Sequence, residues 1–433
     1  MRGVPLTLRG LLLVSGVILL IFSNTASHAI AFQIGAVGLV GLAAAICVVT
    51  GRVRLQRLTF LDYMFVAMVF FSLTASVIHQ DPYIFVYSLV FLATYASICV
   101  LVRTMSDEEI AFAITVSISL SVLLVFIVDS KSILTSLAPG AANRWELRFM
   151  PFGMTPDLAG YVYGGFVVVL LFSNFSNVPV LRHAGWTARV GLAGMSALIT
   201  LAASARAGLL AVVLTLGFYV ARNVTFHKRL RIYLILFVVL LFAAIWVFWP
   251  TVEAYMTEML ELNSSTRGLN SGGSGRLELW ERGIELVFSR SWELLIGSGL
   301  RSSGFDQIGF STESSYITLS IEMGIFLPFF LVGCFLFLLY RLGRIEFTRA
   351  TPFDKIAFYF ITFAMLQSVF NRYLIAIGNP LSLMFLLVVS RAFLKQSLER
   401  QMRMARGRRP SFSNPAPIQP EPAATRQRPL PGR

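Results

Sequence analysis

Charged residues are scarce in this 433-residue chain, making up 13% of it against about 25% in an average soluble domain. The apolar set of Ala, Val, Ile, Leu, Met, Phe, Trp, Tyr and Cys makes up 56%, and the mean hydropathy is +0.73. This composition excludes a soluble globular enzyme, and it excludes a disordered chain because such chains have low hydrophobicity. Apolar runs of about 20 residues, each long enough to cross about 30 Å of hydrocarbon, instead predict a polytopic membrane protein.

Cysteine and histidine are too few and too scattered to indicate a metal centre. Cys47, Cys99 and Cys334 lie in separate apolar segments without metal-ligand spacing, so no disulfide or zinc framework is expected. The four histidines are equally dispersed. The Gly/Ser run at residues 272–275 is not followed by Gly-Lys-Ser/Thr, so nucleotide hydrolysis is not supported. We therefore expect no metal and no other cofactor.

Apolar windows predict twelve transmembrane helices, near residues 8–26, 29–50, 60–78, 82–102, 109–128, 158–174, 188–203, 206–221, 230–249, 313–340, 355–371 and 376–394. Counted over alternate connections, most of the 36 basic residues fall on one side together with both termini. The positive-inside rule makes that side cytoplasmic, and the net charge of +14 then needs no nucleic-acid partner. The outer basic residues are Lys131, Arg144, Arg148, Arg206, Arg267, Arg276, Arg282, Arg290, Arg301 and Arg372.

Two long connections, residues 129–157 and 250–312, fall on the outer side, where long loops tend to carry function. The second contains the stretch RLELWERGIELVF with helical apolar spacing, so we expect short helices capping the bundle between spans 9 and 10. Residues 1–400 are expected to form one integral membrane domain. Residues 401–433 are rich in Pro and Arg and predict a disordered, basic cytoplasmic tail held near anionic lipids.

Two outer arginines are candidate anion ligands. Arg206 lies in LAASARAGLL, between apolar residues at the turn joining spans 7 and 8. It either snorkels to the outer headgroups or pairs with a carboxylate, or it offers a bidentate guanidinium to phosphate. Arg276 follows the Gly/Ser run and begins a helix, so backbone N–H groups and a guanidinium point to one place.

Outer carboxylates are the candidates for proton transfer. Glu313 is expected in the first turn of the tenth span, capped by Ser311 or Thr312. It either complements the helix dipole or acts as a general base held ionised by that helix terminus. Asp306 is the alternative base, and Glu322 is expected to be a hydrogen-bonded packing residue.

Four segments between about residues 148 and 330 resemble those of one family of enzymes, in the same order and between the expected helices. SGRLELWERGIELVFSRSWELLIGSGL resembles a Ser-Gly-Arg stretch with Trp four positions on and a later Gly-x-Gly, and SARAGLL a Ser-Arg turn. TPDLAGY is similar to Asn-Pro-Asn-x-Leu-Ala, and ESSYITLSIEMG to His-Asn-x-Tyr-Leu followed by Glu-x-Gly. The chain thus resembles the O-antigen ligase and polymerase (Wzy-like) family. Its members transfer a glycan from undecaprenyl diphosphate to an acceptor hydroxyl at the outer face of the bacterial inner membrane, without metal or nucleotide sugar.

This resemblance implies an all-α membrane glycosyltransferase in which Arg206 and Arg276 grip the diphosphate. Glu313 stands in place of the family's histidine as base, Ser314 in place of its asparagine, and Asp157 replaces another asparagine. The remaining substrate-binding residues that it implies are Arg148, Trp280, Arg282, Asp306, Ser314 and Tyr316.

With Glu313 in place of the histidine, the chain resembles exopolysaccharide polymerases more than lipopolysaccharide ligases. Attack from the face opposite the diphosphate predicts inversion at the anomeric carbon. The implied partners are the undecaprenyl-diphosphate-linked glycan, membrane lipids and other polysaccharide assembly proteins. Two alternatives stay open: a ligase that moves a finished glycan to another lipid or protein, and a lipid-linked glycan transporter, for which inverted repeats and broken helices would be typical.

Overall fold

The computed structural model describes residues 7–23, 29–51, 58–137, 148–173, 185–226, 246, 249–250, 253, 275–289, 293–346 and 349–407. Throughout this part the elements are helices, with one 3-10 turn at Pro151–Gly153 and no strand. The chain divides into a unit of Met1–Leu394 and a unit of Lys395–Arg433, and the packing described below is that of the first unit.

The helices follow one another as α1 Leu8–Phe22, α2 Ala29–Val49, α3 Phe60–His79, α4 Pro82–Thr104, α5 Asp107–Leu137, α6 Pro156–Phe172, α7 Gly185–Ala202, α8 Arg206–Phe226, α11 Arg276–Ser289, α12 Glu293–Ile296, α13 Phe305–Ile308, α14 Ser315–Met323, α15 Phe326–Gly343, α16 Pro352–Gln367 and α17 Pro380–Gly407. The expected ninth span, near residues 230–249, and the tail beyond residue 407 lie almost wholly outside the described residues. Short helices do form in the described part of the long connection before α14.

Six of these helices, α2, α3, α4, α5, α15 and α17, are long and apolar enough to cross a membrane. Helices α1 and α6 are shorter but also apolar. The expectation of a helical, multi-pass membrane protein is therefore confirmed. The count of twelve spans and the side on which each loop lies remain predictions.

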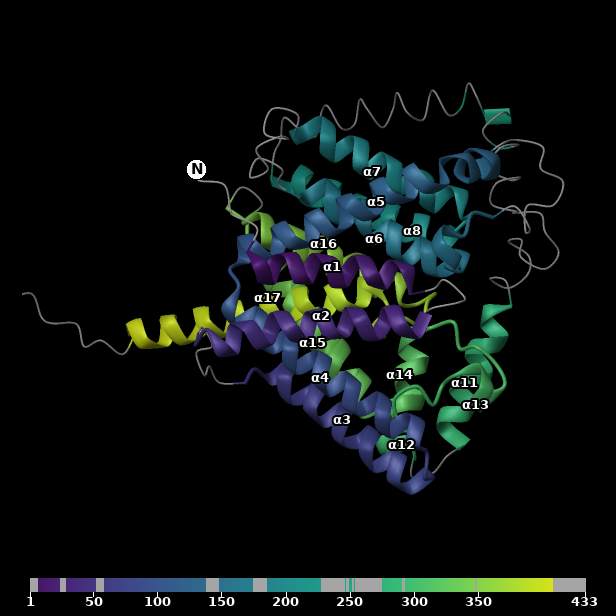
Figure 1. The fold of residues 1–433 in the computed structure, drawn as a ribbon, viewed down its shortest axis with the longest axis vertical. Coiled ribbons are helices and arrows are strands. Elements are labelled where there is room, and N and C mark those ends of the chain that lie inside the picture. The colour runs from purple at the N-terminus through teal and green to yellow at the C-terminus, as the bar shows by residue number, and fades with distance from the viewer. Residues whose placement is uncertain are drawn as a thin grey trace, which may run out of the picture. The chain divides into compact units, whose positions relative to one another are not determined.

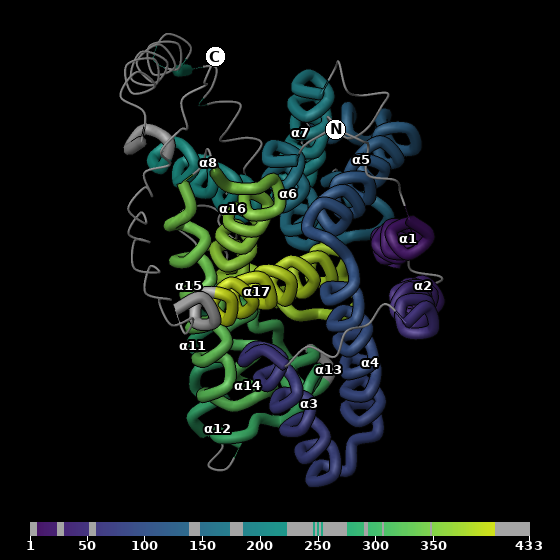
Figure 2. Tube along the Cα trace, turned by 90° about the vertical axis from the view of Figure 1, so that its left-hand side faces the viewer, coloured from purple at the N-terminus to yellow at the C-terminus, as the bar shows by residue number. Residues whose placement is uncertain are grey.

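The first half of α17 forms the centre of the bundle. Its residues from Leu381 to Val389 are at most 3% exposed around the whole helix circumference, as expected for a helix that is apolar on every side. Figures 1 and 2 both show it between one group of helices, α5–α8 with α16, and another containing α3, α4 and α14.

Paired charges gather at one end of the helices, here called the basic end, where α1, α3 and α5 begin and α4 finishes (Figure 1, left). Arg9 pairs with Glu109 at 2.8 Å, and Arg103 with Asp62 at 2.8 Å. Asp62 also forms the capping box of α3 with Thr59. Its carboxylate therefore caps the start of α3 and pairs with Arg103 of the neighbouring α4. The opposite end, with α11–α13 and the connection from α16 to α17, is called the loop end.

The tenth span, expected as one helix over residues 313–340, is broken in the structure. Helix α14 ends at Met323, Gly324 adopts φ 72° and ψ −178°, and α15 begins at Phe326. A Cβ on Gly324 would lie 2.4 Å from the carbonyl oxygen of Leu295, and Ile325 donates its N–H to Leu294. The apolar run therefore bends because the α12 segment packs against the break. Helix α5 is instead longer than the span expected over residues 109–128. It continues to Leu137, and the backbone at Asp129 within it is non-helical.

Candidate functional site

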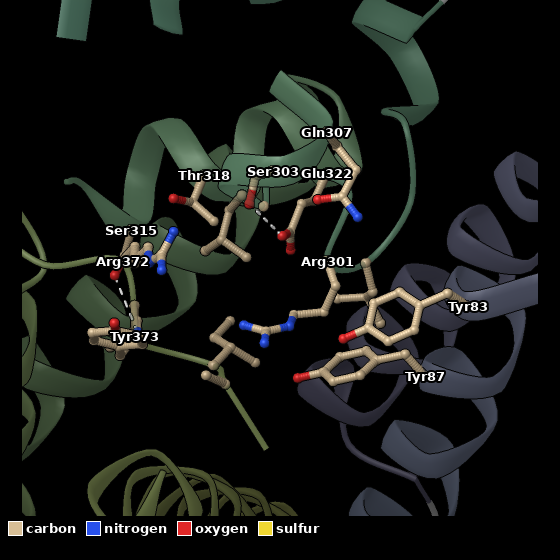
Figure 3. Close-up of a pocket in the computed structure, with 16 residues that line it drawn as sticks. Tyr83, Tyr87, Arg301, Ser303, Gln307, Ser315, Thr318, Glu322, Arg372 and Tyr373 are labelled. Carbon is tan, nitrogen blue, oxygen red and sulfur yellow. Dashed lines mark hydrogen bonds between the residues drawn. The ribbon is translucent and has the colours of Figure 1, made fainter. Parts of the chain in front are cut away.

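A cavity of about 460 Å³ lies at the loop end of the molecule, and we call it the loop-end cavity (Figure 3). Four parts of the chain form its wall: the start of α4, the segment after α12, α14, and the connection from α16 to α17. The polar residues that line it are Tyr83, Tyr87, Arg301, Ser303, Gln307, Ser315, Thr318, Glu322, Arg372 and Tyr373.

Two arginines bring positive charge to this cavity. Figure 3 shows the Arg301 guanidinium extending into it beside Tyr83 and Tyr87, and its central carbon lies 5.5 Å from the centre of the Tyr87 ring. Burial acts to lower the pKa of Arg301, but the phenol groups of Tyr87 and Tyr83 and the carboxylate of Glu322 outweigh it, so this pKa lies above its ordinary value. Arg372 enters from the wall near Ser315. The cavity is therefore cationic.

One carboxylate, that of Glu322 near the end of α14, also belongs to the cavity wall. The residue is 5% exposed, and its carboxylate accepts a 2.6 Å hydrogen bond from the Ser303 hydroxyl. The charge of Arg301 acts on the same carboxylate. A carboxylate in the wall of a cavity is placed to accept a proton from a group that enters the cavity.

The segment that carries Arg301 is fixed by its backbone. Ser298 and Gly299 donate N–H groups to Ile321 and Glu322 at 2.9 Å, and Leu300 donates to the Ser72 hydroxyl at 2.7 Å. A Cβ on Gly297, which has φ 75°, would lie 2.3 Å from the backbone of Glu322. The Gly-Ser-Gly sequence thus permits the close approach that places Arg301 and Glu322 in one cavity.

A second polar cluster adjoins this cavity. An Arg276 nitrogen lies 3.2 Å from a carboxylate oxygen of Asp157. The Asn371 amide donates to the Asp157 carbonyl at 3.2 Å, and the cavity-lining Ser315 donates its hydroxyl to the Asn371 carbonyl. The ion pair between Arg276 and Asp157 is therefore linked to the cavity wall through Asn371.

Arg206 begins α8 at the same end of the bundle. Helices α6 and α8 approach closely there, because a Cβ on Gly208 would lie 2.6 Å from the carbonyl oxygen of Gly160, which is one turn after Asp157. Arg148 is 7% exposed, and the next residue, Phe149, donates its N–H to Ala202 before the same turn. Arg276 therefore contacts the start of α6 directly, while Arg148 and Arg206 belong to segments that pack beside it. Convergence of Arg206 and Arg276 on one anion remains a prediction.

Glu313 lies outside the helix in which it was expected. Helix α14 begins at Ser315 with Ser314 as its N-cap, so the expected cap at Ser311 or Thr312 is wrong and Glu313 is not in the first turn. Its φ is 49°, and its carboxylate accepts a hydrogen bond from Ser311 at 2.8 Å. The lining of the loop-end cavity does not include it.

The other residues implied by the resemblance are dispersed around this end. The Tyr316 hydroxyl donates to the Met365 carbonyl at 2.8 Å, and the Trp280 ring lies 6.0 Å from that of Phe370. Arg282 is exposed and pairs with Glu278 on its own helix at 2.5 Å. Asp306 belongs to α13, but its side chain lies outside the described residues.

An apolar cavity of about 230 Å³ adjoins the cationic one, and we call it the α2–α4 groove. The two share Tyr83 and Tyr87. Most of its other lining residues are apolar, and several are exposed on the outside of the bundle, such as Ile30 at 73% and Ile34 at 67%. This arrangement places an apolar surface groove beside the guanidinium of Arg301.

Sequence reasoning missed the residues that form the loop-end cavity. Arg301 and Arg372 appeared only among the outer basic residues, and Glu322 was expected to be packing. The Gly-Ser-Gly before Arg301 was the available local signal, but nothing in the chain order indicates that α4 supplies Tyr83 and Tyr87. Among the described residues, no group of three or more His, Cys, Asp or Glu side chains is arranged to hold a metal ion. Comparison with known protein families and with characterised proteins found no match.

Proposed function

We propose that this protein is a polysaccharide polymerase that transfers a glycan from an undecaprenyl-diphosphate carrier to a sugar hydroxyl at the outer face of the bacterial inner membrane. The observation that carries the proposal is the pairing of a cationic cavity, containing a buried carboxylate, with an apolar groove. A lipid diphosphate has the matching two parts: an anionic headgroup and a long apolar chain.

In this proposal, the main contribution to catalysis is electrostatic stabilisation of the leaving diphosphate by arginines. A glycosyl diphosphate reacts by loss of diphosphate from the anomeric carbon, so negative charge grows on the leaving oxygen. Arg301 and Arg372 stabilise that charge in the loop-end cavity, and Arg206 and Arg276 extend the cationic surface toward α6. Fixed guanidinium groups in a partly dehydrated site favour the transition state over the ground state.

Glu322 accepts the proton of the acceptor hydroxyl in this scheme. Its place in the cavity wall and its hydrogen bond from Ser303 support this role, which sequence analysis assigned to Glu313. The hydroxyl oxygen forms the new bond to the anomeric carbon as the carbon–oxygen bond to diphosphate breaks. Attack from the opposite face inverts the anomeric configuration.

The α2–α4 groove supports a lipid-linked donor over a free one. Its exposed isoleucines lie on the outside of the bundle, where an isoprenoid chain can pack while its headgroup reaches Arg301 past Tyr83 and Tyr87. A ligase with a different acceptor would use the same donor site. The break at Gly324 is the feature that fits a transporter, and a transporter would move the lipid without forming a glycosidic bond.

The test uses purified protein with lipid-linked repeat units and follows polymer length. Arg301→Lys and Arg372→Lys retain charge but remove the bidentate guanidinium. Each should lower turnover by about 10²- to 10³-fold, the usual effect of removing one transition-state donor. Arg349→Lys is the matched control, since Arg349 is 84% exposed and pairs with Glu346 away from the cavity.

Normal polymer from both cavity variants would contradict the proposed site. Glycan moved to a different acceptor would indicate a ligase, and lipid translocation without a new glycosidic bond would indicate a transporter.

A further inference from the structure

Helix α11, Arg276–Ser289, lies at the loop end and differs in direction from the spanning helices. Figure 1 shows it running across the direction of α1, α2 and α17. Helices that cross a bilayer run close to its normal, so a helix that lies across them at one end of the bundle runs along the membrane plane. This orientation is typical of helices that lie at the boundary between hydrocarbon and water.

One face of α11 packs against the rest of the protein. Gly283 and Val287 are buried on this face, and a Cβ on Gly283 would lie 2.6 Å from a side-chain carbon of Ile317 in α14. The Trp280 ring lies 6.0 Å from that of Phe370 on the same side of the helix. These contacts account for only part of the apolar surface of α11.

A second apolar face of α11 is exposed. Leu277, Ile284 and Phe288 are 59%, 49% and 62% exposed, and their spacing places them on one face of the helix. Transfer of such side chains from water to an apolar environment is favourable. This face therefore indicates contact with an apolar surface that the packing against α14 does not supply.

Acidic residues occupy the next face around the helix. Glu278, Glu281 and Glu285 are exposed and recur at intervals that keep them together on that face. Arg282 pairs with Glu278 at 2.5 Å, which leaves the face acidic. Anionic headgroups would repel these carboxylates, so the apolar face fits lipid acyl chains and the acidic face fits water.

The exposed apolar surface continues from α11 to a spanning helix. Helix α11 contacts α12, where Leu295 is 53% exposed and its carbonyl lies at the break at Gly324. Phe326 and Phe329, in the first turn of α15, are 55% and 74% exposed. Because α15 is long and apolar enough to cross a membrane, its exposed apolar side chains face lipid. This lipid-facing surface extends through α12 to α11.

We infer that α11 is an interfacial helix whose Leu277, Ile284 and Phe288 insert among lipid acyl chains at the loop end, while its glutamates face water. The partner of this surface is the bilayer itself. Insertion fixes the depth of α11 and of Arg276 at its start. The inference does not depend on the proposed glycan transfer, because none of the three inserted residues lines the loop-end cavity.

Spin labels in the full-length protein test this insertion. The three native cysteines are first replaced by alanine, and single cysteines then carry a nitroxide at Ile284 or Phe288. Glu285 and Ser289, which are exposed on the polar side of α11, are the matched control positions. In phosphatidylcholine nanodiscs, oxygen dissolved in the acyl chains should relax the labels at 284 and 288, and a water-soluble nickel chelate should lose access to them. The two control labels should show the reverse.

A second measurement on the same inference uses fluorescence and leaves the native cysteines in place. Phosphatidylcholine brominated on its acyl chains should quench the emission added by Phe288→Trp more than that added by Ser289→Trp. Equal quenching of the two, or nickel access at 284 and 288 equal to that at the control positions, would overturn the inference. Labels shielded from both oxygen and nickel would overturn the lipid assignment in favour of a protein contact. Insertion seen only with phosphatidylglycerol would overturn the assignment to acyl chains in favour of anionic headgroups.

Discussion

At the scale of single residues, two glutamates near α14 differ in ways that chain position does not reveal. Glu322 is buried beside Ser303 and Arg301 in the wall of the loop-end cavity. Glu313 lies in the segment before the helix and accepts a hydrogen bond from Ser311. A base must reach the proton that it removes, so cavity position favours Glu322.

Paired substitutions separate these two residues. Glu322→Gln should lower glycan transfer by about 10²- to 10⁴-fold, the usual range for general-base catalysis, while Glu313→Gln keeps most of it. A carboxylate base is inactive once it is protonated, so wild-type turnover should fall on acidification. The pH profile of the purified enzyme checks this, and the acidic limb should be absent from the residual activity of Glu322→Gln.

The reverse result, with Glu313→Gln inactive and Glu322→Gln near normal, would return the base to the residue indicated by the family resemblance. Normal unfolding temperatures of both variants are needed for either interpretation, because the buried Glu322 carboxylate also accepts a hydrogen bond from Ser303 that the substitution alters.

At the scale of elements, the break between α14 and α15 positions the cavity wall. Gly324 has a φ of 72° with an extended ψ, a combination that residues other than Gly rarely adopt. The segment before the break carries Glu322, and the α12 segment that packs against it leads directly to Arg301. The break therefore fixes the segment that carries Glu322 against the segment that leads to Arg301.

Gly324→Ala tests this role. The substitution should lower the free energy of unfolding by about 1–3 kcal/mol from backbone strain alone, and the clash with Leu295 adds to that loss. Gly333→Ala is the matched control, because nothing lies within 4 Å of its Cβ position in α15, and Ala in a helix interior is favoured by about 0.5–1 kcal/mol. Thermal unfolding in detergent measures both, and equal stability of the two variants would show that the break is not constrained.

At the scale of the whole molecule, the basic end and the loop end of the helix bundle carry different features. Ion-paired arginines such as Arg9 and Arg103 lie at one end of the bundle, and α11–α13 lie at the other (Figure 1). By the positive-inside rule we predict that the basic end faces the cytoplasm.

Reporter fusions test this orientation. A periplasmic reporter should be active after residue 80 or 309 and inactive after residue 51, 105 or 407. Truncation after Gly407, where α17 ends, should leave glycan transfer unchanged, because the Pro- and Arg-rich composition beyond it cannot build a packed site. Periplasmic activity from the fusion at 407 would contradict the orientation. Loss of transfer at normal protein level would contradict dispensability of the tail.

The sequence alone determined the class of the protein and many helix boundaries. The span expected at 82–102 is α4 Pro82–Thr104, because Asp81 accepts from the N–H groups of Tyr83 and Ile84 and Pro82 occupies the first turn. The span expected at 60–78 is α3 Phe60–His79, where Thr59 and Asp62 form the capping box. These signals are local, so hydropathy and the residues next to a helix end were sufficient.

Only the tertiary structure decided where the candidate site lies. The apolar run of residues 313–340 does not reveal its break, because hydropathy does not register a turn that is stabilised by Leu294 and Leu295. Likewise, Tyr87, Arg301 and Arg372 come from distant parts of the chain and meet because α3 and α14 fix the segment between α12 and α13. A cavity is formed by several packed elements and not by any one of them. Residue type and position in the sequence therefore identified the outer arginines but did not indicate which residues share a cavity with them.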